Sequence, residues 1–400
     1  MRHPNSPPKA APDTKARATD RISEFDALRG IAASSVMIYH YLFVYDGRWG
    51  HTFKVPGFFE FGRYGVLLFF MVSGFVIFMS LERRPSTGAF VLSRVTRLFP
   101  SYWVSVAVTF AVVAVLGMPD YDFTLISNVG LVDYDVSVTE ALWNLTMVHS
   151  PFGVTHVDGV YWTLIIELAF YTWMIVMLRL GWLSRPERLA GVVLVIFLAT
   201  NVFILALSWR PSVAVYNLLL LAWGNLFLAG IMFYRLRTLR PWSAVPIIFG
   251  TLVIEFLLRP DSLWLVCLLY VLFTLLAFDR LRVLAARPLF WLGAISYPLY
   301  LTHQNIGYIV INRLYGAGFD NPAIVIGVPI LLALALATAI HRFVEVPGQR
   351  VLRDWLRRRP LSDRLVIPRP LGWAPPTMLL ASIPRRFRSG VSRVSQHRQQ

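Results

Sequence analysis

Apolar residues in this chain come in blocks of about twenty, separated by short polar or basic connections. A helix of twenty residues is about 30 Å long, which is the thickness of the hydrocarbon core of a bilayer. The pattern therefore predicts ten membrane-spanning helices, over residues 25–45, 64–81, 90–116, 161–180, 189–207, 213–234, 242–258, 262–278, 289–311 and 323–342. The stretch TEALWNLTMV at 139–148 is too short to span, and we expect it to be re-entrant or interfacial.

The composition agrees with this pattern. Of the 400 residues, 56% are hydrophobic and only 15% are charged, which excludes a set of soluble domains. The predicted fold class is an all-α polytopic membrane bundle of about ten transmembrane helices with no separate soluble domain. We expect residues 1–21 to be a disordered cytoplasmic segment, 22–347 the transmembrane domain and 348–400 a basic cytoplasmic tail. The single cysteine, Cys267, lies in an apolar block, so disulfides and cysteine-based metal sites are excluded and no metal is expected.

The net charge of +16 is placed at chain ends and connections, as the positive-inside rule describes. With the N-terminus inside, the internal cytoplasmic connections hold thirteen basic residues and the outer ones hold six. The thirteen are Arg83, Arg84, Arg94, Arg97, Arg179, Arg185, Arg188, Arg235, Arg237, Arg240, Arg280, Arg282 and Arg287. The six are Arg48, Lys54, Arg63, Arg210, Arg259 and Arg313. Both termini are therefore expected in the cytoplasm, with anionic membrane lipid rather than nucleic acid as the partner of the positive charge.

The first block, FDALRGIAASSVMIYHYLFV, contains an arginine and a histidine at membrane depth. Arg29 and His40 are eleven residues apart, which at 100° per residue places both on one helix face, about 16 Å apart along the axis. They could be a snorkelling residue and an interfacial residue at opposite membrane surfaces. They could instead face a protein interior or a wet cavity, where charged side chains inside membranes normally lie.

Four further polar residues lie in the predicted third and fourth helices. Arg94 and Arg97 share a helix face, either as ordinary positive-inside residues or, with Arg29, as a cationic mouth for a phosphorylated ligand. Glu167 lies about six residues into its helix, where so short a side chain cannot easily reach the interface. It needs an ion-pair partner or a wet cavity, and Tyr171, one turn on, shares its face.

The remaining polar positions are less specific. His303 follows Pro298 in the block WLGAISYPLYLTHQN, and a proline at that depth is tolerated where cavities form. His303 could equally be an interfacial residue. Ser73 and Gly74 permit close helix approach, and packing is their expected role. We expect Glu345, just beyond the last block, to be exposed.

Six segments together resemble the acyltransferase-3 family of integral-membrane O-acyltransferases. They are the first helix with its Arg29–His40 spacing, followed in the family's order by GVLLFFMVSGF, FVLSRVTRLFPSYW, YWTLIIELAFY, ISYPLYLTH and HRFVEVP, and they cover residues 22–347. The resemblance implies ten spans in a bacterial cytoplasmic (inner) membrane. It also implies an acyl-CoA co-substrate, commonly acetyl-CoA, without a permanently bound cofactor. The implied acceptor is a hydroxyl of a glycan, a glycolipid or another hydroxylated small molecule.

The resemblance also implies roles for individual residues. Arg29 and His40 match the family's essential first-helix pair, and Arg94 and Arg97 match its third-helix pair. The expected catalytic residues are His40, Arg29 and Glu167, the expected donor-binding residues are Arg29, Arg94 and Arg97, and the further candidates are His303, Tyr171 and Ser73.

We expect His40 to be the general base or transiently the acyl carrier, because its unperturbed pKa is close to neutrality. Some family members carry an extracytoplasmic hydrolase-like domain that has no counterpart here, so we expect transfer to the final acceptor within the membrane core. The alternative function is a secondary transporter or flippase that uses the intramembrane Arg, His and Glu as coupling groups.

Overall fold

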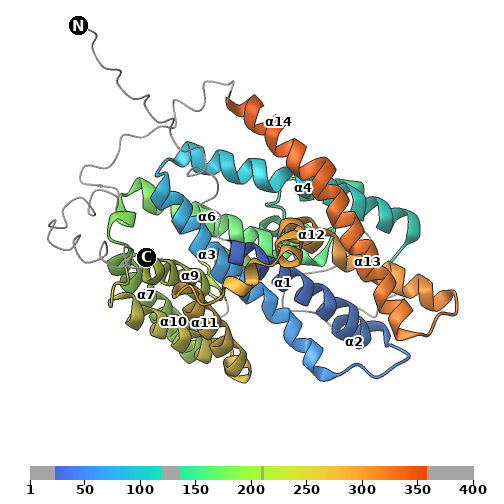
Figure 1. Cartoon of the computed structure of the whole chain (residues 1–400), viewed down its shortest axis with the longest axis horizontal. Coiled ribbons are helices and arrows are strands. Elements are labelled where there is room, and N and C mark those ends of the chain that lie inside the picture. The colour runs from blue at the N-terminus through green and yellow to red at the C-terminus, as the bar shows by residue number, and fades with distance from the viewer. Residues whose placement is uncertain (1–22, 119–135, 209–210, 358–400) are drawn as a thin grey trace, which may run out of the picture.

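The computed structural model describes residues 23–118, 136–208 and 211–357, and every regular element in these ranges is helical (Figure 1). The predicted segments 1–21 and most of 348–400 lie outside the described residues. The helices are α1 (Ser23–Tyr39), α2 (Tyr45–Trp49), α3 (Gly65–Arg83), α4 (Thr87–Leu116), α5 (Val138–Asn144), α6 (Trp162–Arg179), α7 (Pro186–Leu207), α8 (Val213–Leu218), α9 (Gly224–Thr238), α10 (Ala244–Leu258), α11 (Leu263–Ala277), α12 (Arg287–Gly316), α13 (Pro322–Ile340) and α14 (Val346–Arg357).

Within the described residues, seven helical segments are long and apolar enough to cross a membrane. They are Glu24–Trp49, Gly57–Arg83, Thr87–Leu116, Gly159–Arg179, Pro186–Leu207, Pro260–Ala277 and Pro322–Leu356. Three predicted spans differ from this group. Helix α10 is apolar but has only 15 residues, and the predicted span 213–234 is divided into α8 and α9. The division follows from the turn at Leu220, whose φ of 56° a continuous α-helix does not allow.

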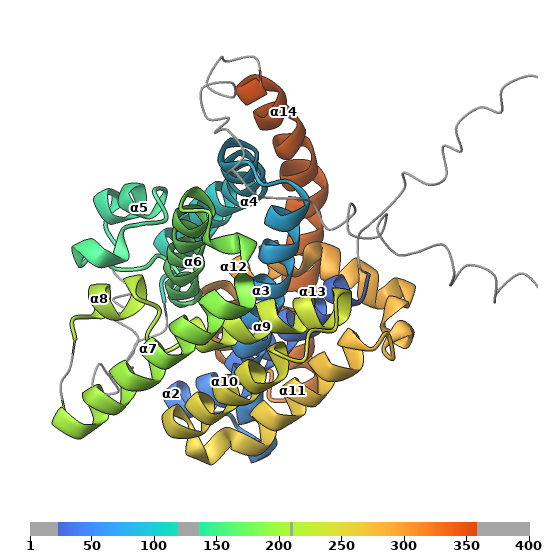
Figure 2. The ribbon, with the colours of Figure 1, turned by 90° about the vertical axis from the view of Figure 1, so that its left-hand side faces the viewer.

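Helix α12 is the third exception, because its polar side chains face the protein rather than lipid. It lies at the centre of the bundle, with α1, α3, α4 and α13 around it (Figures 1 and 2). Residues 295–309 of this helix are all buried. The buried polar ones are Ser296, Thr302, His303, Gln304 and Asn305. A helix that carries such a polar stripe has a low mean hydropathy but is well suited to line an internal site.

Glycines bring helix backbones into direct contact at two places. A Cβ atom on Gly293 of α12 would lie 2.1 Å from the carbonyl oxygen of Asp26 in α1. A Cβ atom on Gly74 of α3 would lie 2.1 Å from the carbonyl oxygen of Phe227 in α9. Membrane helices commonly associate through such small residues. The predicted packing role of Gly74 is thus confirmed, and α1 is held tightly against α12.

Helix α1 widens at its end into a π-helical turn, His40–Val44, which continues directly into α2. Such turns insert a residue into an α-helix and are frequent at functional sites. Both His40 and Tyr41 contact α12 from this turn, because the side chain of His40 and the hydroxyl of Tyr41 both bond to His303.

The segment 136–161, which contains the predicted short helix as α5, folds against the bundle. Asn144 at the end of α5 is buried, and its side chain bonds to the backbone of Glu140, Thr155 and Val157. The hydroxyl of Tyr102 in α4 donates to the carbonyl of Asn144. This segment therefore packs against the middle of α4, at Tyr102, and of α12, at Asn305.

Candidate active site

The centre of the candidate site is a pair of histidines from α1 and α12. The Nδ1 atom of His40 lies 2.9 Å from the Nε2 atom of His303. The other ring nitrogen of His303, Nδ1, lies 2.9 Å from the carbonyl oxygen of Tyr300 and 3.1 Å from that of Leu299. His303 is fully buried, so these contacts fix its ring.

The hydrogen bonds assign the tautomer of both rings. Carbonyl oxygens only accept hydrogen bonds, so Nδ1 of His303 carries a proton and Nε2 of the neutral ring accepts. Nδ1 of His40 must then be the donor to His303, which leaves Nε2 of a neutral His40 with a free lone pair. That is the atom a general base requires.

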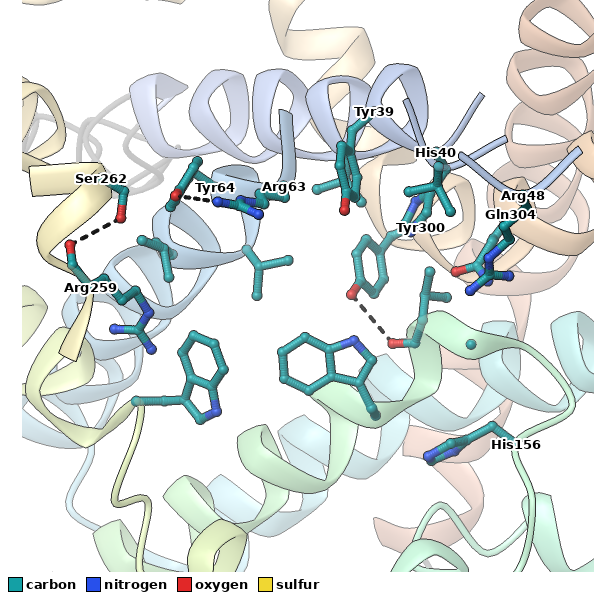
Figure 3. Close-up of a pocket in the computed structure, with 18 of the residues that line it drawn as sticks. Tyr39, His40, Arg48, Arg63, Tyr64, His156, Arg259, Ser262, Tyr300 and Gln304 are labelled. Carbon is teal, nitrogen blue, oxygen red and sulfur yellow. Dashed lines mark hydrogen bonds between the residues drawn. The ribbon is translucent and has the colours of Figure 1, made fainter. Parts of the chain in front are cut away.

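His40 lines a cavity of about 520 Å³, which we call the His40 cavity (Figure 3). Its wall comes from α1, α2, α3, α6, α12 and the segments 156–160 and 258–262. Polar side chains that line it include Tyr39, Arg48, Arg63, Tyr64, His156, Arg259, Asp261, Ser262, Tyr300 and Gln304, and two tryptophans, Trp162 and Trp223, form an apolar part. A volume of this size suits a small-molecule ligand or one sugar unit with its neighbours.

Arg29 lines a second cavity, of about 460 Å³, which we call the Arg29 cavity. Arg97 of α4 lines it too, and both arginines are half-buried. Neither guanidinium has a hydrogen bond or an ion pair with any residue that the structure describes. The carboxylate of Glu345 in the same wall is occupied by His341 and Gln349. Two half-buried cations without protein acceptors are suited to bind an anion.

A narrow space of about 60 Å³ lies between the two cavities, and we call it the neck. Arg29, Ser296 and Tyr297 line both the neck and the Arg29 cavity, whereas Val66 and Tyr300 line both the neck and the His40 cavity. The three spaces thus follow one another through the bundle. Arg29 and His40 open toward one passage from opposite ends, as their shared helix face predicts.

Glu167 lies at the neck with the other predicted residues of its region. Its carboxylate accepts hydrogen bonds from the hydroxyl of Tyr171, at 2.5 Å, and from that of Ser73, at 3.2 Å. Glu167 and Ser73 line the neck together with Arg29, whereas Tyr171 is behind them. No ion pair to Glu167 occurs in the described part of the chain, so a wet cavity rather than an ion pair accounts for its position.

Arg94 and Arg97 are three residues apart in α4, but the structure gives their side chains different surroundings. The guanidinium of Arg94 lies over the rings of Phe90, at 5.5 Å, and Tyr171, at 5.9 Å, and its Nε donates to the hydroxyl of Ser93. Arg94 lines neither cavity nor the neck. Its expected contact with the donor remains a prediction, whereas Arg97 has the position that such a contact requires.

The position of Glu345 differs from the sequence-based prediction. Glu345 is buried, only 7% exposed, because the π-helical turn His341–Glu345 points it inward toward His341 and Gln349. Glu255, an acidic residue in the apolar helix α10, is fully buried and pairs with Arg259 four residues later at 2.6 Å. The i, i+4 spacing of Glu255 and Arg259 is the signal that predicts this pair.

Sequence reasoning also missed a buried acidic residue beside the histidine pair. Asp158 accepts hydrogen bonds from the backbone N–H groups of Val160 and of Asn305, and so ties the segment before α6 to α12 next to His303. Burial raises the pKa of the Asp158 carboxyl to about 7. Asp158 is one of several acidic residues in this connection, and nothing in the local sequence indicates that it contacts α12.

A second pair of histidines lies in the same segment. Nε2 of His149 lies 2.7 Å from Nδ1 of His156, and His156 lines the His40 cavity. Burial lowers the pKa of His149 to about 4, and burial together with His149 lowers the pKa of His156 to about 3, so both rings are neutral near pH 7. Within the described residues, no cluster of His, Cys, Asp and Glu is arranged to hold a metal ion.

The described helices form a bundle of the membrane-spanning class, with the His40–His303 pair at one cavity and Arg29 and Arg97 at another. An acyltransferase domain model matches residues 22–342, so the chain belongs to the acyltransferase-3 family and is a membrane acyltransferase. No solved structure matches the chain.

Two curated relatives agree with the family assignment. The chain is 29% identical over 366 residues to the putative membrane-bound transacylase BcsY of Komagataeibacter xylinus, a match that covers 86% of each protein. It is 28% identical over 204 residues to nodulation protein 10 of Rhizobium leguminosarum bv. viciae. The second match covers 46% of this chain and spans about half, 51%, of that relative.

Proposed function

We propose that this protein moves an acyl group, acetyl in the simplest case, from cytoplasmic acyl-CoA to a hydroxyl of a glycan, a glycolipid or another hydroxylated acceptor. The observation that carries the proposal is the passage of two cavities and a neck, with unpaired arginines at one end and the His40–His303 pair at the other. Each part matches one requirement of acyl transfer from CoA.

The Arg29 cavity suits the nucleotide end of the donor. The CoA moiety carries a 3′-phosphate and a pyrophosphate, and guanidinium groups bind phosphate through paired, charge-assisted hydrogen bonds. Arg29 and Arg97 have no competing acceptor in the described chain, so their binding capacity is available to such a ligand. The excess of basic residues on this side supports a cytoplasmic opening, where acyl-CoA is made.

The neck suits the pantetheine arm. Its volume of about 60 Å³ is far below the 520 Å³ and 460 Å³ of the two cavities, so it suits a slim chain better than a sugar or a lipid headgroup. Arg29 and His40 are about 16 Å apart along the helix, a length that the pantetheine arm and its thioester can cover. A narrow neck also favours the enzyme over the alternative of a transporter or flippase, which has to pass its whole cargo.

The chemistry takes place at His40. Nε2 of His40 removes the proton of the acceptor hydroxyl while the hydroxyl oxygen attacks the thioester carbonyl carbon. The carbonyl π electrons move to oxygen, and collapse of the tetrahedral intermediate breaks the C–S bond. The CoA sulfur leaves and takes the proton from the His40 imidazolium. His303 holds the His40 ring in the tautomer that these proton transfers require.

The acceptor would enter the His40 cavity from the opposite membrane surface. The faces of Trp162 and Trp223, with ring centroids 5.5 Å apart, offer apolar surface, and the arginines and tyrosines offer hydrogen bonds. This mixture suits a sugar. The relation to the putative membrane-bound transacylase BcsY supports acyl transfer at a membrane. We place the protein in a bacterial cytoplasmic membrane with both termini inside, because its basic residues are concentrated on that side.

The proposal is tested with purified protein in lipid nanodiscs and acetyl-CoA, by measuring the release of free CoA with a thiol reagent. A Cys267→Ala background removes the protein's own thiol from the assay. We expect turnover that depends on an added hydroxylated acceptor and falls by about 10²–10⁴ in His40→Gln, because the amide nitrogen is not basic. No release of CoA from any acyl-CoA, or equal turnover in His40→Gln, would reject the proposal.

A further inference from the structure

One face of α12 forms a wall of the His40 cavity. Tyr300, Gln304 and Tyr308 are four residues apart, so they lie above one another on one side of the helix, and all three line the cavity. The hydroxyl of Tyr300 is occupied by the hydroxyl of Thr163, at 3.0 Å, and the carbonyl of Val160, at 3.3 Å. Gln304, between the two tyrosines, directly follows His303.

Gln304 is a buried residue whose carboxamide faces the cavity without a partner among the described residues. The side chain is only 5% exposed, and its amide forms no hydrogen bond with the residues that the structure describes. Buried side-chain amides are nearly always hydrogen-bonded, since an unmade bond costs about 1–3 kcal/mol. An amide in a cavity wall without a protein partner indicates that a ligand supplies one.

The chain positions this amide by a close backbone contact. A Cβ atom on Gly159 would lie 2.5 Å from Nε2 of Gln304, so the side chain occupies space that only a glycine leaves open. Asp158, the preceding residue, fixes this segment to α12 through the N–H of Asn305. The amide is therefore held between two anchored backbones rather than free in the cavity.

A positive charge lies at the same end of the cavity as the amide. Arg48 and Gln304 both line the cavity and are drawn at the end where His40 lies (Figure 3). The guanidinium of Arg48 is stacked over the rings of Trp49 and Tyr308, at 6.0 Å and 5.9 Å. It is close enough to His40 for its charge to act on that ring.

We propose that the carboxamide of Gln304, assisted by the charge of Arg48, stabilises the oxyanion that forms when the acceptor hydroxyl adds to the thioester. The inference rests on the proposed acyl transfer and assigns it a second catalytic group. While His40 accepts the hydroxyl proton, the carbonyl π electrons become a lone pair on oxygen, and an N–H of Gln304 donates to that oxygen. When the C–S bond breaks, the carbonyl re-forms and the hydrogen bond weakens. Donors that face developing charge contribute more in the transition state than in the ground state.

The test compares steady-state kinetics of Gln304→Met with the wild type in the same nanodisc assay. Methionine retains the length and volume of the side chain but has no N–H. We expect kcat to fall by about 10²–10³, the usual cost of one oxyanion donor, with the KM for acyl-CoA and for the acceptor within about twofold. A kcat within about threefold of the wild type would overturn the proposal. So would a raised acceptor KM at unchanged kcat, since that describes a group that only binds substrate.

Gly159→Ala is the second variant, because it leaves Gln304 in the chain and displaces only its amide. We expect a similar fall in kcat, and the double variant Gly159→Ala/Gln304→Met should lose less than about threefold beyond either single variant. Independent, multiplicative losses would overturn the positioning step. Gly327→Ala in α13, where a Cβ meets nothing within 4 Å, is the matched control and should retain wild-type kinetics. Failure of the proposed function can be told apart from failure of the Gln304 inference, because the wild type and His40→Gln would then have equal turnover.

Discussion

His303 holds the ring of His40 from a position 263 residues later in the chain, through a contact of 2.9 Å between Nε2 and Nδ1. The contact joins the end of α1 to α12, and the backbones of these two helices are in direct contact at Gly30 and Gly293. Because Nδ1 of His303 donates to carbonyl oxygens, the geometry alone assigns the donor and the acceptor in the neutral pair.

The first prediction concerns this pair. His303→Leu leaves Nδ1–H of His40 without an acceptor, so the ring can rotate or change tautomer, and we expect kcat to fall by about 10²-fold. His303→Gln can still present an amide oxygen to His40 and should retain more activity than His303→Leu. Turnover with saturating acceptor measures both. Equal activity in the two variants would show that the hydrogen bond does not orient His40.

The second prediction separates the two arginines of α4. Arg97→Gln removes one cation from the Arg29 cavity and should weaken acyl-CoA binding by roughly 10- to 150-fold, the value of a charge-assisted hydrogen bond of about 1.5–3 kcal/mol. Arg94→Gln should change the affinity much less, because Arg94 lies over Phe90 and Tyr171. Calorimetry with a non-hydrolysable acyl-CoA checks this. An equal loss in both variants would place Arg94 at the donor as well.

The third prediction is a pH effect on stability. The folded-state pKa of Asp158, about 7, is above its value of 3.8 in an unfolded chain, so the folded protein binds the proton more tightly. The contribution of Asp158 is most favourable below pH 3.8 and is lost as the pH rises through about 7, on the order of 4 kcal/mol in total. His149 and His156 act in the opposite sense, because their lowered pKa values favour the folded state above pH 6.5 and are lost as the pH falls toward 4 and 3.

The contribution of Asp158 is isolated by the difference in melting temperature between the wild type and Asp158→Asn, measured from pH 4 to 8. We expect the variant to gain relative to the wild type as the pH rises. Its amide has one acceptor oxygen for two N–H groups, which lowers its stability at every pH by about 1–3 kcal/mol. A difference that does not change with pH would contradict the raised pKa.

The fourth prediction concerns the contact between α1 and α12. Gly293→Ala places a Cβ 2.1 Å from the carbonyl oxygen of Asp26, so the helices must separate, at a cost of about 1–3 kcal/mol or more. We expect a lower melting temperature and a loss of acyl-CoA binding, since Arg29 lies next to Gly30. Gly316→Ala, in the same helix with nothing within 4 Å of its Cβ, is the control.

The fold could be predicted from the sequence because a helix that crosses lipid must be about twenty residues long and apolar. Blocks of about twenty apolar residues predict the long helices, and the described helices lie where those blocks are. The prediction fails where a helix is surrounded by protein, as in α12, or where a turn interrupts an apolar run, as at Leu220. Hydropathy predicts the residues that face lipid, but it does not identify a helix that is surrounded by protein.

The site was only partly predictable for a related reason. Arg29 and His40 are recognisable because they share one helix face, a local property of the chain. The contact of His40 with His303, and the exclusion of Arg94 from the Arg29 cavity, depend on how distant helices pack. The position of the Gln304 amide depends on a close approach at Gly159, which no spacing in the sequence reveals.

The narrow neck has a consequence for the electrical insulation of the membrane. A neck of about 60 Å³ with the fixed cation Arg29 at its wall repels protons and metal ions, much as an arginine does in water channels. In the proposed reaction the phosphates stay at Arg29 and Arg97 while the acyl group, which is uncharged, reaches His40. Moving one elementary charge against 100 mV requires about 2.3 kcal/mol, and an uncharged acyl group requires none. Acylation should therefore proceed at the same rate in energised and de-energised vesicles.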